Sequence, residues 1–336
     1  MVAQSDRVVI IGVAGDSGCG KSTFLRRLTD LFGEEFMTVI CLDDYHSHDR
    51  KGRKEAGLTA LNPKANDFDL MYEQVKALKN GQAIDKPIYN HETGNIDPPE
   101  RIEPNKVIVI EGLHPFYDER VRSLVDFGVY LDISDQVKIQ WKIARDMSER
   151  GHRYEDILAS INSRRPDFEA YIEPQKEHAD VVLQVLPTQL IDDPECNYLR
   201  VRLIQREGVE SLDPVYLFDE GSTIDWRPCG RKLTCSYPGI KMFYGPDVYY
   251  GHEVSVLEVD GRFDNLEEMI YIETHLSKTA TKFYGEMTDL LLKHREAPGS
   301  ENGSGLFQVL VGLKMRETYE HLTATLGSVA VAVKCS

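Results

Sequence analysis

Residues Gly15–Ser22 read GDSGCGKS and fit the pattern G-x-x-x-x-G-K-[ST]. The apolar run VVIIGVA before this stretch predicts a buried strand, and KSTFLRRLTDLF after it predicts a helix. Glycines let such a loop turn its backbone N–H groups inward, and the helix start adds positive potential, so the loop suits phosphate. Because motif, strand and helix agree, a chance glycine-rich turn is the weaker interpretation. The expected phosphate-binding residues are Gly15, Asp16, Ser17, Gly18, Cys19, Gly20, Lys21, Ser22 and Thr23.

The composition restricts the class of partner. With 336 residues the chain has room for one large α/β domain or two smaller ones. Its net charge of -16 argues against a nucleic-acid partner. No apolar run is long enough to span a membrane, and the start MVAQSDRVVIIG lacks the pattern of a signal peptide. We expect an intracellular protein that binds neither nucleic acid nor a membrane.

Strand and helix patterns alternate along the first part of the chain. Strands are expected near 7–14, 37–43, 106–111, 127–133 and 180–186, and helices near 21–32, 67–80, 135–150 and 154–164. This alternation is typical of the α/β class, with a mostly parallel sheet and helices on both faces. The stretch 80–105 is rich in Pro, Gly, Asn and Asp and is expected to form a long surface loop.

The pattern changes after 187–196. Short β-like runs follow (YLRVRLIQ, PVYLF, KLTCSY and EVSVLEVDG), and then two helical stretches near 264–295 and 305–334. We therefore expect a nucleotide-binding and catalytic core over 1–190 and a C-terminal α+β extension over 191–336, packed on the core. GSENGSG at 299–305 has the composition of a linker.

Carboxylates follow the second expected strand, which ends in Asp43 and Asp44 before the basic segment HSHDRKGRK. Ligands of parallel sheets bind beyond the carboxyl ends of the strands, so this segment should lie beside the phosphate-binding loop. A carboxylate there could orient or deprotonate an acceptor hydroxyl, while the cations hold an anionic acceptor. The alternative is a capped strand end followed by a solvated charged loop. Glu111 ends the run VIVIEG, where an acid can hold Mg²⁺ together with the Ser22 hydroxyl.

The stretch WKIARDMSERGHRYED predicts a helix whose basic residues lie three to five positions apart. Such a face could close over ATP and stabilise the transferring phosphoryl group, or it could simply be solvated. Its candidates are Lys142, Arg145, Asp146, Arg150 and Arg153.

Three classes of protein share the loop motif: ATPases, GTPases and kinases. The acid after the second strand and the cations beyond it favour a small-molecule kinase. One alternative is a nucleoside kinase of the uridine-kinase type, which does not have to bind an acceptor phosphate. Another is a regulatory or scaffold protein that uses ATP as a conformational signal, and Asp43 with Arg50 and Arg53 disfavours it.

Several segments together closely resemble the phosphoribulokinase family of oxygenic phototrophs, namely GDSGCGKST, CLDDYHSHDRKGRK, YNHETG, VIVIEGLHPFYDERVR, KIARDMSERG, RRPDFEAYIEPQ and CGRKLTCSYPGIKMFYG. The resemblance covers nearly the whole chain. It implies transfer of the ATP γ-phosphate, with Mg²⁺, to the 1-hydroxyl of ribulose 5-phosphate in the Calvin cycle.

The resemblance also implies residue roles. Asp43 would be the general base, Lys21 and Arg145 would assist transfer, and Glu111 would serve the Mg²⁺ site. The remaining residues would handle the sugar phosphate or complete the lid: His46, Arg50, Arg53, Tyr89, Lys142, Asp146 and Arg150.

Two cysteines lie close to these residues, Cys19 inside the loop and Cys41 two residues before Asp43. A helix start and Lys21 are expected to lower the pKa of the Cys19 thiol. If the two Cα atoms approach within about 7 Å, the thiols can be bridged. Their spacing alone leaves a redox switch and two unrelated buried thiols equally open, and the resemblance favours the switch. It also pairs Cys229 with Cys235.

The same resemblance implies partners and location. A homodimer is expected that is reduced by thioredoxin. When oxidised, it would join glyceraldehyde-3-phosphate dehydrogenase through the small disordered linker protein of the Calvin cycle. The opening lacks a long Ser/Arg-rich presequence, so we expect the cytoplasm of a cyanobacterium, or the chloroplast stroma for a processed form.

Overall fold

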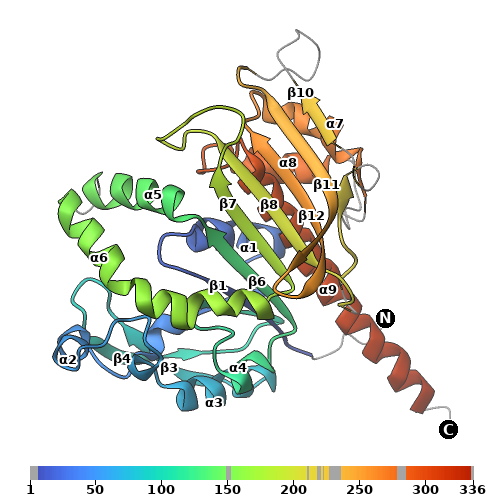
Figure 1. Cartoon of the computed structure of the whole chain (residues 1–336). Coiled ribbons are helices and arrows are strands. Elements are labelled where there is room, and N and C mark those ends of the chain that lie inside the picture. The colour runs from blue at the N-terminus through green and yellow to red at the C-terminus, as the bar shows by residue number, and fades with distance from the viewer. Residues whose placement is uncertain are drawn as a thin grey trace.

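The structure is a computed structural model that describes residues 7–148, 153–209, 212–217, 221, 223–226, 236–277 and 285–333. Within these residues the main feature is a nine-stranded sheet with the strand order β10-β11-β12-β8-β7-β6-β1-β5-β2 (Figure 1). No helix of the described part is long and apolar enough to cross a membrane.

Half of this sheet is parallel. Its strands pair in parallel register, Val13 with Glu111 and Gly15 with Leu131 for example, and the side chains of β1, β5 and β6 are almost all buried. A strand that is covered on both faces has a continuous run of apolar residues, and such runs allowed these strands to be predicted from the sequence. They are β2 (Met37–Cys41), β5 (Val107–Gly112), β1 (Val9–Gly15), β6 (Phe127–Ile133) and β7 (Val181–Pro187).

The other half is antiparallel and belongs to the predicted extension. The boundary between core and extension was predicted at residue 190, between β7 and β8. These two strands pair with each other, so one continuous sheet includes strands from both sides of that boundary. The division into two domains stays a prediction. The antiparallel strands are β8 (Leu199–Arg206), β12 (His252–Gly261), β11 (Ile240–Tyr249) and β10 (Thr223–Trp226).

Helices cover both faces, as predicted. Successive side chains of β1 point to opposite faces of the sheet. Val9 and Ile11 belong to the buried cluster that contains residues of α1, α8 and α9, and Ile10 belongs to the cluster that contains residues of α3 and α4. The helices are α1 (Lys21–Phe32), α2 (Arg50–Glu55), α3 (Phe68–Lys79), α4 (Glu119–Arg122), α5 (Asp135–Ser148), α6 (Tyr154–Asp167), α7 (Met269–Glu273), α8 (Glu286–Lys293) and α9 (Gly303–Val333).

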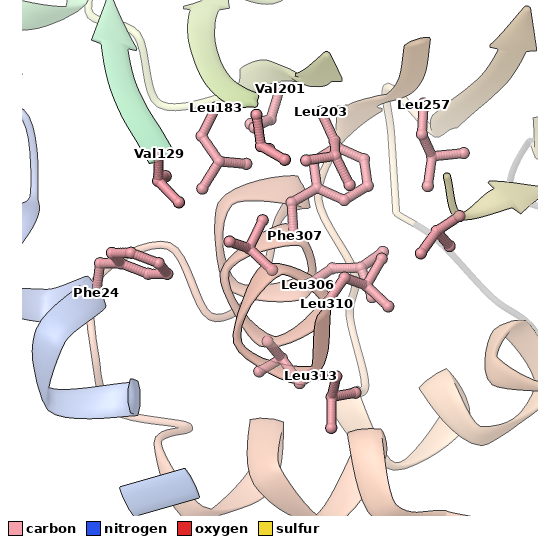
Figure 2. Packing of buried hydrophobic residues seen from close by; sticks show 14 of the residues in the cluster. Phe24, Val129, Leu183, Val201, Leu203, Leu257, Leu306, Phe307, Leu310 and Leu313 are labelled. Atoms are coloured by element: carbon pink, nitrogen blue, oxygen red, sulfur yellow. The ribbon is translucent and has the colours of Figure 1, made fainter. Parts of the chain in front are cut away.

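The long C-terminal helix α9 fills the centre of the larger core. Figure 2 shows its side chains Leu306, Phe307 and Leu310 next to residues of strands from both halves of the sheet, and Phe24 of α1 nearby. A Cβ added at Gly312 would lie 3.0 Å from Leu31 Cδ2, which shows how closely α9 approaches α1. The extension is therefore joined to the first helix of the phosphate-binding unit.

Three sequence predictions were wrong in part. The 80–105 stretch contains an antiparallel ribbon of β3 (Ile84–Tyr89) and β4 (Ile96–Ile102). Proline is tolerated there because an edge strand does not need every N–H for pairing. The 264–295 stretch is broken into α7, α8 and β13 (Leu276–Ser277), which pairs with β9 (Tyr216–Leu217). The 299–305 segment is no linker, because Ser300 and Ser304 are buried and α9 begins at Gly303.

Candidate active site

The phosphate-binding loop joins β1 to α1, as its motif predicted. A Cβ at Gly15 would lie 2.7 Å from both Cys19 Sγ and the Leu131 carbonyl oxygen, so this position has room only for glycine. Gly20 has a left-handed φ of 94°, and open space surrounds the place where its Cβ would be. The loop is therefore tightly built behind Gly15 and open in front of Gly20, where a ligand can approach the start of α1.

Lys21 bends back over this loop. Its Nζ donates to the carbonyl oxygens of Gly15 (3.0 Å) and Asp16 (3.1 Å). Burial lowers the pKa of the Lys21 ammonium, but the neighbouring Asp43 and Glu111 carboxylates oppose burial and the net shift is upward. Lys21 is therefore held as a cation inside the loop.

One large cavity, about 810 Å³, lies over the loop. It brings together predicted residues from several parts of the sequence. Its lining consists of Ser17, Gly18, Cys19, Gly20, Lys21, Ser22, Thr23, Cys41, Asp43, His91, Glu111, Leu113, Trp141, Lys142, Val185, Pro298, Gly299, Ser304 and Gln308.

Two acids face this cavity from neighbouring strand ends. Cys41, the last residue of β2, is paired in register with Glu111 of β5, and Asp43 follows in a 3-10 turn over Leu42–Tyr45 rather than in the predicted strand. A Cβ at Gly112 would lie 3.3 Å from Asp43 Oδ1, so glycine lets this turn fold against β5. Burial raises the pKa of the Glu111 carboxyl; Lys21 opposes this shift and Asp43 adds to it.

Asp44 has a different position from Asp43, although the sequence offers both. It is buried, forms a close ion pair with Lys86, and accepts a hydrogen bond from the Tyr89 backbone N–H (2.8 Å). These contacts attach the β3–β4 ribbon to the end of β2. Asp44 is thus occupied in holding the ribbon, and Asp43 is the acid of the pair that lines the cavity.

Three predicted acceptor residues, His46, Arg53 and Tyr89, meet beside Asp43. The His46 and Tyr89 rings are 4.9 Å apart, and Tyr89 lies 5.0 Å from His91. Arg53 stacks over the Tyr89 ring at 4.7 Å and donates to its hydroxyl (2.6 Å). His46 Nδ1 lies 2.9 Å from Asn66 Oδ1. Burial, followed by Arg53, lowers the pKa of His46 and favours its neutral ring.

Arg50 lies farther out. Its guanidinium donates to the backbone oxygens of His91 (2.5 Å) and Glu92 (3.3 Å), and its backbone N–H donates to Gly94 O. In this structure Arg50 therefore fastens α2 to the tip of the β3–β4 ribbon.

The predicted lid is only partly described. Lys142 lines the cavity, and Arg145 and Asp146 belong to α5. Arg150 lies outside the described residues. Lys138 of α5, which no motif in the sequence marks, also reaches the loop: its Nζ forms ion pairs with Asp16 (3.2 Å) and Asp135 (3.1 Å). This lysine attaches α5 to the loop.

One expectation about the thiols is contradicted, the low pKa of Cys19, and the predicted disulfide stays a prediction. Cys19 and Cys41 are free, and Cys229 and Cys235 lie outside the described residues. Burial raises the pKa of Cys19 and outweighs Lys21, so the predicted low pKa was wrong. Burial and the Asp43 and Glu111 carboxylates also raise the pKa of Cys41. Both thiols are therefore protonated in this state.

Three further features near the site were not predicted as functional: buried His114, and Trp141 and the 298–308 segment, which line the cavity. His114 packs edge-on against Phe68 (5.6 Å) and Tyr117 (5.5 Å). The sequence has no motif for any of them. The apolar run that begins at Leu306 was the only sign that the neighbouring glycines and serines start a core helix.

Comparisons with known proteins agree with this geometry. Residues 10–192 match the model of the phosphoribulokinase/uridine kinase family. A phosphoribulokinase from Synechocystis sp. is 78% identical over 96% of this chain and 98% of its own length. The chloroplastic phosphoribulokinase of Mesembryanthemum crystallinum is 63% identical over 96% of this chain and 86% of its own length.

A uridine kinase from Brevibacillus brevis is 37% identical, but the match covers only 58% of this chain and 88% of that enzyme. The two phosphoribulokinases thus match nearly the whole chain, whereas this uridine kinase matches little more than half of it. The chain therefore belongs to the phosphoribulokinase/uridine kinase family of kinases, and within it groups with the phosphoribulokinases of cyanobacteria and chloroplasts.

Proposed function

We propose that this chain transfers the γ-phosphoryl group of ATP to the 1-hydroxyl of ribulose 5-phosphate, forming ribulose 1,5-bisphosphate and ADP in the Calvin cycle. The observation that carries the proposal is the joint lining of one cavity by the phosphate-binding loop, Asp43 and Glu111, with a basic and aromatic cluster directly beside them. The 78% identity to the Synechocystis phosphoribulokinase supports the choice of acceptor.

The donor side is assigned to the loop. The N–H groups from Gly15 to Thr23 surround the phosphates, and the Lys21 cation compensates the charge that develops during transfer. A serine hydroxyl and a carboxylate are oxygen ligands of the kind that Mg²⁺ prefers, and Ser22 and Glu111 line the same cavity. These two residues would hold the ion, which supplies positive charge to the phosphates.

The acceptor side is assigned to Asp43 and its neighbours. Asp43 accepts the proton of the attacking hydroxyl as general base. His46, Arg53 and Tyr89 hold the sugar phosphate, and Arg50 positions the ribbon tip that carries His91. Lys142, Arg145, Asp146 and Arg150 complete the acceptor site and lid, with Arg145 assisting the transfer.

We further propose regulation by a Cys19–Cys41 disulfide. Cys19 lies inside the phosphate-binding loop, Cys41 ends β2, and both line the same cavity. A bond between them would tie the loop to the end of β2 and so constrain the phosphate site. The two thiols lose two protons and two electrons to a disulfide oxidant, and thioredoxin returns them.

The remaining assignments rest on the family. We propose a second pair at Cys229 and Cys235, a homodimer, and assembly of the oxidised enzyme with glyceraldehyde-3-phosphate dehydrogenase and the small disordered linker protein. The location would be the cyanobacterial cytoplasm or the chloroplast stroma.

The test measures ADP release from MgATP with either ribulose 5-phosphate or uridine, and identifies the product by mass spectrometry. We expect ribulose 1,5-bisphosphate and no turnover with uridine. Preference for uridine would replace the proposal with the nucleoside kinase, and nucleotide binding without a phosphorylated product would replace it with the scaffold. Asp43→Asn should abolish turnover, whereas Asp85→Asn, the same change on the exposed face of the ribbon, should not.

A further inference from the structure

The cavity over the loop extends beyond the reacting groups. Asp43 and Glu111 lie at the ends of β2 and β5, whereas Val185 belongs to β7, three strand spacings or roughly 14 Å from β5. On the β7 side the extension contributes the uncharged residues Pro298, Gly299, Ser304 and Gln308. Trp141 and Val185 add apolar surface there. An uncharged, partly apolar wall suits a heterocyclic base and not a phosphate.

The segment that forms this wall is fixed in place. The Gly305 N–H donates to Gly299 O (2.8 Å), and the Ser304 N–H donates to Asn302 Oδ1 (2.8 Å). A Cβ at Gly303 would lie 2.9 Å from Val201 Cβ of β8, so the start of α9 also fits closely against the sheet. The wall is therefore as well defined as the loop opposite.

Within the wall, Gln308 is oriented by a buried arginine of α1. Arg27 is 4% exposed; its Nη1 donates to Gln308 Oε1 in a close contact, and its Nη2 donates to Ser300 Oγ (2.6 Å). A guanidinium has no acceptor, so the carboxamide must turn its oxygen toward Arg27. Gln308 lines the cavity, and its NH₂ group has no hydrogen-bond acceptor among the described residues, so it is free to donate to a ligand there.

We propose that Gln308, held by Arg27, reads the base of the nucleotide and gives the site its preference for adenine over guanine. The inference rests on the proposed use of ATP and adds the residue that selects it. Adenine presents a hydrogen-bond acceptor at N1, which an NH₂ donor satisfies. Guanine carries a hydrogen at N1, so the two donors would face each other and both would lose their bonds to water.

A second polar group in the wall fits adenine as well. The Ser304 hydroxyl is buried and has no hydrogen-bond partner within the described part of the chain. A hydroxyl can accept a hydrogen bond from the N6 amino group of adenine, and it can equally donate one to the O6 of guanine. Ser304 therefore adds to the binding of a purine base, and Gln308 supplies the discrimination.

The test uses Gln308→Glu, which keeps an oxygen for Arg27 and so preserves the buried contact, but removes the donor. Binding of MgATP and MgGTP is measured by calorimetry, and turnover of each nucleotide is measured with saturating ribulose 5-phosphate. We expect the Kd for MgATP to rise about tenfold or more, and the ratio of ATP to GTP affinity to fall by a similar factor. Gln82→Glu, the same change at an exposed turn far from the cavity, is the matched control and should leave both nucleotides unaffected.

Ser304→Ala provides an independent test of the proposed base site. Because the hydroxyl has no partner to lose, the variant should keep the wild-type melting temperature while binding MgATP severalfold more weakly. If both folded variants retain the wild-type Kd for MgATP and the wild-type preference, Gln308 does not read the base. If the wild type binds no nucleotide at all, the proposed function itself fails, which is a separate outcome.

Discussion

His114 makes the stability of the fold depend on pH in a way that can be measured. Its side chain is 2% exposed, and burial lowers its pKa to about 4, against about 6.5 for an exposed histidine. The unfolded chain therefore binds the proton more tightly than the folded chain. The stability that the neutral ring contributes is complete above pH 6.5 and is lost as the pH falls toward 4.

Linkage gives the size of this effect. Between pH 7.5 and pH 5.5, a shift from 6.5 to 4 removes about 1.4 kcal/mol from the free energy of unfolding. His114→Phe keeps an aromatic ring between Phe68 and Tyr117 and removes the titration. The variant should therefore lose about 1.4 kcal/mol less than the wild type over this pH interval, whatever constant offset its packing adds.

The assay is urea unfolding followed by tryptophan fluorescence at several pH values above the sequence pI of about 5.1. Tyr117→Phe is the control, because it alters the same aromatic cluster and tyrosine does not titrate in this range. Its pH slope should match that of the wild type. Equal slopes for His114→Phe and the wild type would refute the reasoning, since the ring would then be protonated equally in both states.

Three further predictions concern the reaction and its control. Asp43→Asn should lower kcat by about 10²–10⁴-fold with an unchanged Kd for MgATP, measured by stopped assay and calorimetry; near-normal turnover would remove Asp43 as the base. Arg53→Lys should raise the KM for ribulose 5-phosphate about tenfold or more and leave the KM for ATP unchanged, because lysine lacks the planar fork; equal effects on both substrates would contradict the assignment. Cys19→Ser should keep its activity after oxidation, and dithiol-reversible inactivation of this variant would place the switch at another pair.

Much of the parallel half of the fold could be predicted because β1, β5 and β6 are buried on both faces and read as unbroken apolar runs. β4 could not, since IDPPERI is almost wholly exposed and owes its conformation to pairing with β3. The 299–305 segment was misjudged for the same reason. Its glycines and serines have the composition of a linker, and contacts with residues distant in sequence, such as Arg27 and Val201, make it part of the core.

The site shows a similar limit. The motif predicted the loop and its lysine, because there the chemistry depends on residues adjacent in sequence. Asp43 and Asp44 are equivalent in the sequence, and what separates them is Lys86, which lies 42 residues from Asp44 along the chain and pairs with it. The pKa of Cys19 was predicted in the wrong direction because the sequence shows Lys21 beside the thiol but not the burial that outweighs it.

The strand order also separates two kinds of selectivity. The proposed acceptor residues His46, Arg50, Arg53 and Tyr89 come from the chain between β2 and β5, on one side of the phosphate-binding loop, whereas Pro298, Gly299, Ser304 and Gln308 of the wall come from the extension, on the other. Substitutions in the ribbon and α2 can therefore change which hydroxyl compound is phosphorylated without touching the wall. An enzyme engineer would treat the two as independent modules, and could recombine ribbons and C-terminal halves from different family members around one unchanged loop.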